Sequence, residues 1–330
     1  MERTMKTVCS VPGNIKLMTI VSISGWFVMS VSLSNINKWI FQNRPFTYPI
    51  FLTTLHLFST VVFCAVFFRL TEMGRSIKQD FDQKQVSQSA SWNILLLSCI
   101  FTVSIACGNI AIRFLYISFL KMIFAMTPLA TLILSRFLLN QSVDIVMYLS
   151  VLPICVGCLM CTIGEINFNI IGFLAALLAT FLRALRSVLQ GVLLKEERID
   201  SLSLLYKMSF PSFLQLATAT VIFEPSVFKD DYLYTNLSTW ILIFMSCFCA
   251  VGYNIMTFLV TFYTSPVTLQ VLGNVSMVLT VGLSLLIFRN EVSWVSLVGI
   301  LFVITGTWIY QKADKVMKFL IDFHILPVKE

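Results

Sequence analysis

Long apolar stretches separated by short polar ones fill the chain from about residue 17 to residue 311. Each stretch is close to the ~20 residues that an α-helix needs to cross a bilayer. No strands are expected. The pattern predicts an all-α polytopic membrane protein with ten transmembrane helices, at 17–40, 48–70, 93–112, 115–138, 144–163, 168–194, 201–223, 238–263, 266–288 and 293–311.

The composition agrees with this prediction. Of the 330 residues, 58% are hydrophobic and only 12% are charged, and the mean hydropathy is +0.87. A soluble chain would have about a quarter of its residues charged. The net charge of +7 comes with no basic run and no solvated segment that mixes basic and aromatic residues. The excess of positive charge is therefore interpreted as a sign of how the chain is oriented in the membrane, and no nucleic-acid partner is expected.

The basic residues also predict an orientation. Fourteen of the 23 lysines and arginines fall on the side of the two termini, five on the opposite side and four within apolar stretches. Because cytosolic loops carry the excess of such residues, both termini are expected in the cytosol. The sequon at Asn236, between the seventh and eighth stretches, would then face a lumen. The first stretch is too long for a secretory signal and is expected to be retained.

A weak internal repeat divides the chain. "GNIAIRFLYIS" resembles "GYNIMTFLVTFYTS", and "RFLLNQSV" resembles "IFRNEVSW". The matched asparagines are 145 and 150 positions apart. Five helices per half make the second half enter the membrane in the opposite direction. We therefore predict one domain over 1–330 built from two inverted five-helix repeats, 1–165 and 166–330.

The nine cysteines do not form a disulfide framework, because eight of them lie inside apolar stretches. Cys155, Cys158 and Cys161 follow a C-x-x-C-x-x-C pattern, but they lie on a continuous helix with no fourth ligand. Packing is therefore favoured over metal binding. No catalytic constellation is found, so we expect no enzyme activity, no cofactor and no metal.

Ionisable residues at membrane depth are the main functional candidates, because each must face a cavity or a partner. Lys121 lies early in the fourth stretch, with Thr127 one to two turns on, and an anionic ligand is favoured over snorkelling or a structural ion pair. Arg183, Arg186 and Gln190 share one face of the sixth stretch. Cavity lining and snorkelling are both open for Arg186, whereas snorkelling is favoured for Arg183.

The ninth stretch adds uncharged polar residues. Gln270 and Asn274 are one turn apart, and Gly273 is expected to permit close helix approach. Hydrogen bonding between helices and ligand binding are equally open for this pair. Tyr253, in the eighth stretch, has the same two interpretations.

Several segments resemble a known family. "GNIAIRFLYISFLKMIFAMTP", "LRALRSVLQGVLL" and "SPVTLQVLGNVSMVLTVGLSLLIFRN" resemble the triose-phosphate and nucleotide-sugar translocator group of the drug/metabolite transporter superfamily, and within it subgroup E of solute carrier family 35. The resemblance implies two inverted five-helix halves and exchange of a phosphorylated sugar or nucleotide sugar for phosphate or a nucleotide monophosphate. It also implies cations on the fourth, sixth and ninth helices and a tyrosine on the eighth. Arg186, Tyr253 and Asn274 match family positions.

The chain departs from the family at other positions. Sugar-phosphate members have a lysine where this chain has Phe124, and a Lys-Arg pair where it has Met277 and Val278. Plant nucleotide-sugar relatives have a lysine at the position of Ser276. Lys121 stands one turn before the usual lysine of the fourth helix. The resemblance therefore implies a site with less positive charge and a less charged substrate.

We expect a secondary carrier, an antiporter, that moves a sugar-linked anionic metabolite by alternating access in the Golgi or another endomembrane. Its partners would be that metabolite, a counter-substrate and the lipid bilayer, with a homodimer left open. The alternative is a non-transporting membrane sensor or assembly factor on a carrier fold, which the missing cations of the ninth helix motivate. The expected substrate-binding residues are Lys121, Arg186, Tyr253, Asn274, Gln270 and Thr127.

Overall fold

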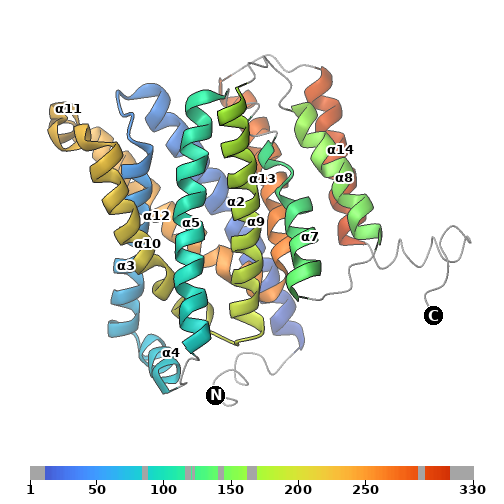
Figure 1. Ribbon diagram of the computed structural model, residues 1–330, viewed down its shortest axis with the longest axis horizontal. Coiled ribbons are helices and arrows are strands. Elements are labelled where there is room, and N and C mark those ends of the chain that lie inside the picture. Colours follow the sequence, from blue (N-terminus) through green and yellow to red (C-terminus); the bar gives the residue numbers. More distant parts are fainter. Residues whose placement is uncertain are drawn as a thin grey trace, which may run out of the picture. The chain divides into compact units, whose positions relative to one another are not determined.

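The computed structural model describes residues 12–83, 88–115, 120, 123–139, 145–161, 169–288 and 294–312. Every regular element in these ranges is a helix (Figure 1). Lys121 lies outside the described residues, as do the side chains of Cys158 and Cys161. The elements are α2 (Pro12–Asn43), α3 (Pro49–Leu70), α4 (Glu72–Gln83), α5 (Gln88–Phe114), α7 (Thr127–Leu139), α8 (Ile145–Cys161), α9 (Ile170–Lys195), α10 (Ser201–Phe223), η1 (Pro225–Lys229), α11 (Asp231–Thr235), α12 (Leu237–Tyr263), α13 (Pro266–Phe288) and α14 (Trp294–Gln311).

The predicted all-helical class is confirmed, and the apolar stretches coincide with helices. The predictions 201–223 and 266–288 match the bounds of α10 and α13. Five helices in the described part are long and apolar enough to cross a membrane: Ile15–Phe41, Pro49–Leu70, Ala90–Ala111, Ile170–Lys195 and Leu237–Tyr263. The total of ten spans stays a prediction.

The fourth predicted stretch, 115–138, differs from expectation because it is not one continuous helix. A turn at Ala125 and Met126 precedes α7, which begins at Thr127. Pro128 explains the interruption, because it lacks the N–H that would bond the carbonyl four residues earlier. Hydropathy alone does not show this break, whereas Pro128 is a local signal for it.

Contacts divide the chain into two compact units. The first comprises 1–103 and 189–265, and the second comprises 104–188 and 266–330. Each unit therefore takes helices from both halves of the sequence, and α5 and α9 contribute to both. The division into repeats at 1–165 and 166–330 is a separate question and stays a prediction.

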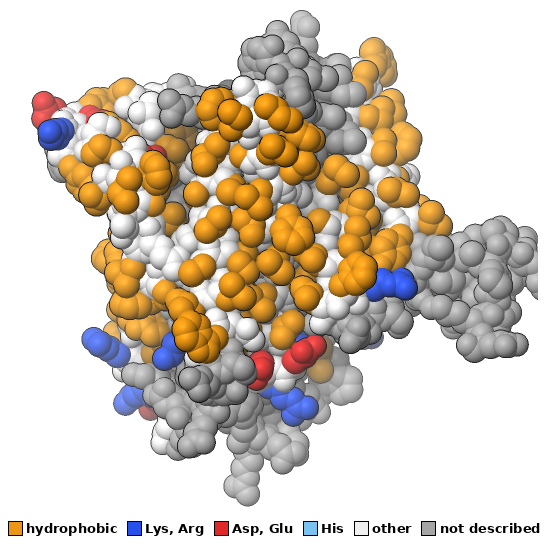
Figure 2. Space-filling model, in the orientation of Figure 1, with side chains coloured by type: hydrophobic (Ala, Val, Ile, Leu, Met, Phe, Trp, Pro, Cys, Tyr) orange, Lys and Arg blue, Asp and Glu red, His pale blue; other side chains and the backbone are white. Residues whose placement is uncertain are grey.

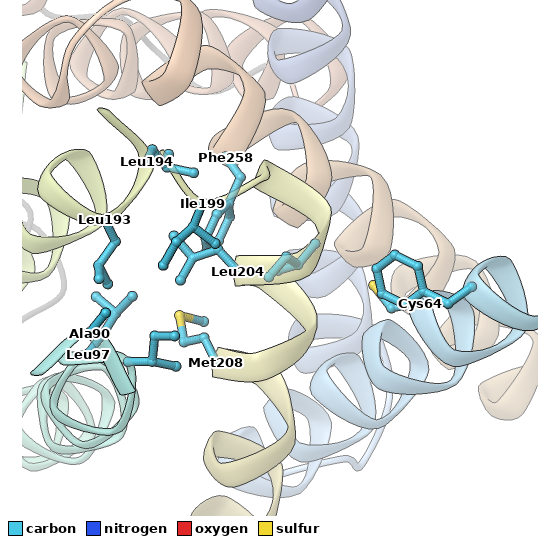
Figure 3. Packing of buried hydrophobic residues seen from close by; sticks show 12 residues of the cluster. Cys64, Ala90, Leu97, Leu193, Leu194, Ile199, Leu204, Met208 and Phe258 are labelled. Carbon is cyan, nitrogen blue, oxygen red and sulfur yellow. The ribbon is translucent and has the colours of Figure 1, made fainter. Parts of the chain in front are cut away.

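The first unit has a core between α3, α5, α9, α10 and α12. Leu97, Leu193, Leu204 and Phe258 are each at most 1% exposed in it (Figure 3). Such burial contributes roughly 1.5–3 kcal/mol per large side chain against water. Within a bilayer, packing supplies much of the association between helices, because lipid tails are themselves apolar.

Helices α2 and α12 of this unit pack through two glycines. A Cβ added at Gly25 would lie 3.2 Å from Sδ of Met256, and one at Gly252 would lie 2.9 Å from Sδ of Met29. The two contacts are reciprocal, since each helix provides one glycine and one methionine. Because the residue numbers rise on one helix as they fall on the other, α2 and α12 are antiparallel.

The second unit has its closest packing between α8 and α14, which lie side by side (Figure 1). A Cβ at Gly157 would lie 2.5 Å from the carbonyl oxygen of Gly299 and 2.8 Å from the backbone nitrogen of Val303. A Cβ at Gly306 would lie 2.8 Å from the carbonyl oxygen of Ser150. Glycine at both positions is therefore required for this backbone-to-backbone approach.

The connection after α10 caps another helix. Both carboxylate oxygens of Glu224 accept backbone hydrogen bonds from the start of α3, from Ile50 N at 3.0 Å and Phe51 N at 2.8 Å. Tyr48, at the N-cap position, makes no side-chain cap of its own. Burial raises the pKa of Glu224, while the two N–H groups lower it by a smaller amount. Glu224 thus ties the end of α10 to the N-terminus of α3.

Hydrophobic side chains dominate the face over α5 and α9 (Figure 2). An unburied apolar surface of this extent is typical of a lipid contact. The exposed apolar residues of α9 are Ile170, Ile171, Leu174, Leu177, Leu178 and Phe181.

Candidate functional site

The break before α7 interrupts the helical backbone in the described part of the second unit. Non-helical backbone at membrane depth is tolerated only where protein buries it or where it lines a cavity. The hydroxyl of Thr127 donates to the carbonyl oxygen of Phe124 at 2.5 Å, which is the acceptor that Pro128 leaves without its helical donor. Thr127 is 4% exposed. Its predicted polar role therefore includes a structural one.

The next carbonyl, that of Ala125, is satisfied from two other helices. Asn274 Nδ2 on α13 donates to it at 2.9 Å, and Cys155 Sγ on α8 lies 3.3 Å from it. Asn274 is 6% exposed. The amide thus holds α13 to the break, as the interpretation of hydrogen bonding between helices expected. Cys155, one of the three cysteines at spacing three, packs here as a buried thiol.

The polar face of α9 becomes more buried toward its C-terminus. Arg183 is exposed, Arg186 is half-buried and Gln190 is 1% exposed. The guanidinium carbon of Arg183 lies 3.8 Å from the ring centroid of Phe124, which is cation–π geometry. This contact joins α9 to the residue just before the break.

In the first unit, polar side chains follow one face of α12. Trp26 Nε1 donates to Thr257 Oγ1 at 3.0 Å, and that hydroxyl donates to the carbonyl oxygen of Tyr253 at 2.7 Å. The rings of Trp26 and Tyr253 lie 5.7 Å apart. Further along, Gln190 Nε2 donates to Thr261 Oγ1 at 3.2 Å. Tyr253 is thus held by an aromatic neighbour on α2.

A second polar group links α12 to α2 and α3. His56 Nε2 and Ser246 Oγ are 2.8 Å apart, and Ser246 donates to Asn37 Oδ1. Asn254 Nδ2 donates to Thr60 Oγ1 at 3.1 Å. These buried and half-buried side chains hydrogen-bond one another, as polar groups within a membrane must.

The other candidates have simpler surroundings. Gln270 is half-buried on α13. The expectation of a close helix approach at Gly273 is wrong for the described part of the chain, because a Cβ there would meet nothing within 4 Å. A glycine in an apolar stretch was an insufficient signal, since the residue type alone does not say which face meets a helix. In the described part of the chain, no group of three His, Cys, Asp or Glu could hold a metal ion.

Of the five candidates that the structure describes, four belong to the second unit and Tyr253 to the first. The sequence interpretation did not single out the partners on which they depend. Polar positions recurring every three or four residues along α12 could have indicated its buried face. The partners that it missed are Trp26 and Thr257 beside Tyr253, Ala125 beside Asn274 and Phe124 beside Thr127.

Comparison with known proteins assigns the family. Residues 17–311 match the model of the Triose-phosphate Transporter family. Solute carrier family 35 member E4 of Rattus norvegicus is 33% identical over 90% of this chain and 81% of its own length. A probable sugar phosphate/phosphate translocator of Arabidopsis thaliana is 34% identical over 92% of this chain and 97% of its own.

Two further similarities are informative. UDP-uronic acid transporter 1 of Arabidopsis thaliana is 31% identical over 89% of this chain and 94% of its own length. One crystal structure shares the fold with a TM-score of 0.68 and 14% identity, over 93% of this chain and 99% of the other. The chain therefore belongs to the Triose-phosphate Transporter family, and it is a multi-pass integral membrane transporter rather than an enzyme.

Proposed function

We propose that this protein is an antiporter that exchanges a sugar-linked anionic metabolite, a nucleotide sugar or a sugar phosphate, by alternating access. The relatives are named for transport of a sugar phosphate and of a UDP-uronic acid, and we extend that substrate class to this chain. We place it in the Golgi or another endomembrane with both termini cytosolic, on the basic-residue bias and the family.

The observation that carries the mechanism is a local symmetry of contacts in the second unit. Gly157 and Gly306 are 149 positions apart. Gly157 approaches Gly299 and Val303, and Gly306 approaches the residues 149 positions before these, Ser150 and Ile154. When a two-fold axis relates two antiparallel helices, each contact between them occurs twice, with the roles of the two helices interchanged. They support α8 and α14 as equivalent members of inverted repeats.

The same shift applies at the helix break. Ala125 and Asn274, joined by the 2.9 Å hydrogen bond, are also 149 positions apart. A residue that contacts its own repeat equivalent lies beside the symmetry axis. The value falls between the two offsets, 145 and 150, that the sequence motifs predict.

Contacts within the first unit follow a similar rule with a slightly larger shift. Thr54 and Thr220 are hydrogen-bonded at 3.0 Å, and the rings of Phe68 and Tyr206 lie 5.7 Å apart. Adding 152 to Thr54 and subtracting 152 from Thr220 yields Tyr206 and Phe68. Ten helices in two inverted halves are therefore our proposed architecture, and such halves are the basis of alternating access in many carriers.

We propose that Lys121 and Arg186 meet the anionic group of the metabolite. Tyr253, Gln270, Asn274 and Thr127 would orient its polar remainder. The two cations are the part of this assignment with the strongest physical basis, because an ionisable side chain at membrane depth marks a substrate path by default.

Counterflow into liposomes tests the proposal. Liposomes that contain the purified protein are loaded with unlabelled UDP-glucuronic acid, glucose 6-phosphate or uridine monophosphate. They should accumulate the same compound in labelled form from outside for at least one of the three. Lys121→Ala should abolish this accumulation while the thermal unfolding midpoint stays within about 2 °C of the wild type. Unchanged counterflow in Lys121→Ala would contradict its role. No accumulation and no thermal stabilisation by any of these compounds would favour the sensor or assembly factor.

A further inference from the structure

Helix α4 forms an elbow with the end of α3 in the first unit (Figure 1). Thr71 ends α3 with an extended backbone. Its hydroxyl donates to the carbonyl oxygen of Phe67 at 2.8 Å and accepts from Gly74 N at 2.9 Å. A Cβ at Gly74 would lie 2.7 Å from Thr71 Oγ1 and would overlap the carbonyl oxygen of Phe67. These contacts fix the direction in which α4 leaves α3.

The elbow lies at the membrane surface. Helix α3 has 22 residues and is about 33 Å long, so it crosses a hydrocarbon core of ~30 Å and its last residues reach the headgroups. Helix α4 has 12 residues, too few to cross, and Met73, Ile77 and Phe81 recur in it every four residues among polar ones. A short helix with this pattern lies in the plane of the interface. Ile77 packs against the core of the first unit, which holds α4 at that level.

Two arginines and two apolar side chains are exposed at the elbow. Arg69 and Arg75 are both exposed, and Leu70 and Met73 are 74% and 63% exposed. Within the described part of the chain, neither guanidinium has an ion pair or a hydrogen bond, although Glu72 stands between them in the sequence. Apolar side chains at the interface enter the acyl region, whereas cations there meet lipid phosphates. The exposed groups of the elbow therefore match the two parts of a phospholipid.

The charge of the elbow selects a class of lipid. Residues 69–78 contain three cations and one carboxylate: Arg69, Arg75, Lys78 and Glu72. The acidic residues of the last turn of α4, Asp80 and Asp82, stand about 7 Å or more beyond Arg75 at ~1.5 Å per residue. A headgroup with net negative charge complements this end of α4 better than a zwitterionic one does.

We propose that the elbow at 69–75 is a binding site for an anionic phospholipid of the surrounding membrane. Arg69 and Arg75 bind its headgroup, and Leu70 and Met73 contact its acyl chains. In the orientation proposed above, the elbow faces the cytosolic leaflet, which is the one that carries anionic lipids. The site is separate from the transport proposal, since it needs no substrate.

Lipid binding by the purified full-length protein in detergent tests the site. The thermal unfolding midpoint is followed against dihexanoyl phosphatidylserine and, separately, dihexanoyl phosphatidylcholine. Each cation near the headgroup contributes ~1 kcal/mol, or about fivefold, so the wild type should prefer phosphatidylserine by at least about tenfold. Arg69→Gln combined with Arg75→Gln should reduce this preference to within about twofold. Lys229→Gln, an exposed cation in η1 at the other end of α10, is the matched control and should keep the wild-type preference.

Further comparisons separate a lipid from a free phosphate ester. Glycerophosphoserine carries the same headgroup without acyl chains, and it should leave the midpoint unchanged at concentrations where the lipid saturates. Leu70→Ser combined with Met73→Ser should weaken binding of both lipids and keep their ratio. In about 0.5 M potassium chloride, where the Debye length is about 4 Å, the wild-type preference should fall, and that of the double glutamine variant should not.

A conservative pair of variants tests a purely structural role of the arginines. Arg69→Lys combined with Arg75→Lys keeps both charges and should keep most of the preference. If the double glutamine variant does not fold, the two single glutamine variants carry the comparison, each with a loss of about fivefold.

Three results would overturn the proposal. The first is equal affinity of the wild type for the two lipids. The second is a double glutamine variant whose preference stays within about twofold of the wild type. The third is stabilisation by glycerophosphoserine equal to that by the lipid, which would identify a site for free phosphate esters instead. Lipid preference without counterflow of any sugar metabolite would leave this site and refute transport, and the opposite result would do the reverse.

Discussion

Replacement of Gly157 by alanine is expected to destabilise the protein. The new Cβ would lie 2.5 Å from the carbonyl oxygen of Gly299 and 2.8 Å from Cβ of Phe302. Ordinary contact begins at 3.4 Å, so α8 and α14 must separate by roughly 0.9 Å. Such overpacking costs about 1–3 kcal/mol, and the better helix propensity of alanine offsets at most about 1 kcal/mol. The net loss of stability should be about 1–2 kcal/mol.

Thermal unfolding in detergent, followed with a thiol-reactive fluorescent dye, measures this loss. Cys64, Cys107 and Cys155 are buried, so their thiols react only as the structure opens. The unfolding midpoint of Gly157→Ala should fall by on the order of 5 °C. Gly273→Ala is the matched control, because its Cβ meets nothing within 4 Å, and its midpoint should stay the same or rise.

A double variant shows whether the two clashes are relieved by the same helix movement. Gly157 and Gly306 contact the same pair of helices, so one separation of α8 from α14 relieves both clashes. The double alanine variant should therefore cost less than the sum of the two single variants. Equal behaviour of Gly157→Ala and Gly273→Ala would refute the argument, as would strict additivity of the two α8–α14 substitutions.

Three further predictions concern the connection between α10 and α12. Glu224→Ala should lower the free energy of unfolding by about 1–2 kcal/mol in the same assay, because two N–H groups of α3 lose their acceptor, and Glu224→Gln should lower it less. Burial raises the pKa of Glu224 above its ordinary value of 4.5. The contribution of Glu224 to stability is therefore greatest below pH 4.5 and falls as the pH rises through the raised pKa. Glu224→Gln should lack this fall, and identical pH profiles of wild type and Glu224→Gln would contradict the prediction. Asn236 Oδ1 accepts a hydrogen bond from Thr239 N at 3.1 Å, and glycosylation would use the other side-chain atom, Nδ2. If this segment is lumenal, expression in a secretory-pathway host should yield a glycosylated band on a gel that an endoglycosidase removes. Asn236→Asp should lose that band and keep the unfolding midpoint, and no shift in the wild type would contradict the lumenal assignment.

Hydropathy was sufficient for most helix positions because membrane helices need a minimum apolar length. It matched α10 and α13 to the residue, and the polar stretch after 70 contains α4. It could not reveal the break before α7. The stability of that break depends on Asn274, about 150 residues later, and on Cys155, and no local pattern encodes such a partner.

The candidate site was predictable to the same extent. Intramembrane charge indicated Arg183 and Arg186 as residues that need an explanation. Whether the guanidinium of Arg183 reaches the lipid headgroups stays a prediction; its contact with the ring of Phe124 is tertiary information that spacing along α9 does not encode. Residue type was also misleading at Gly273, because glycine favours close approach only where another helix lies opposite it.

The glycine contacts of the two units differ in mechanical compliance. Between α2 and α12, Gly25 and Gly252 meet the thioether ends of Met256 and Met29, whose side chains have three rotatable bonds. Between α8 and α14, Gly157 meets a carbonyl oxygen and a backbone nitrogen, which cannot rotate away. The α2–α12 contact can therefore shear by exchanging methionine rotamers at little cost, whereas α8 and α14 must move as one stiff pair. Within the first unit, a load on the bundle would be absorbed first at its methionines.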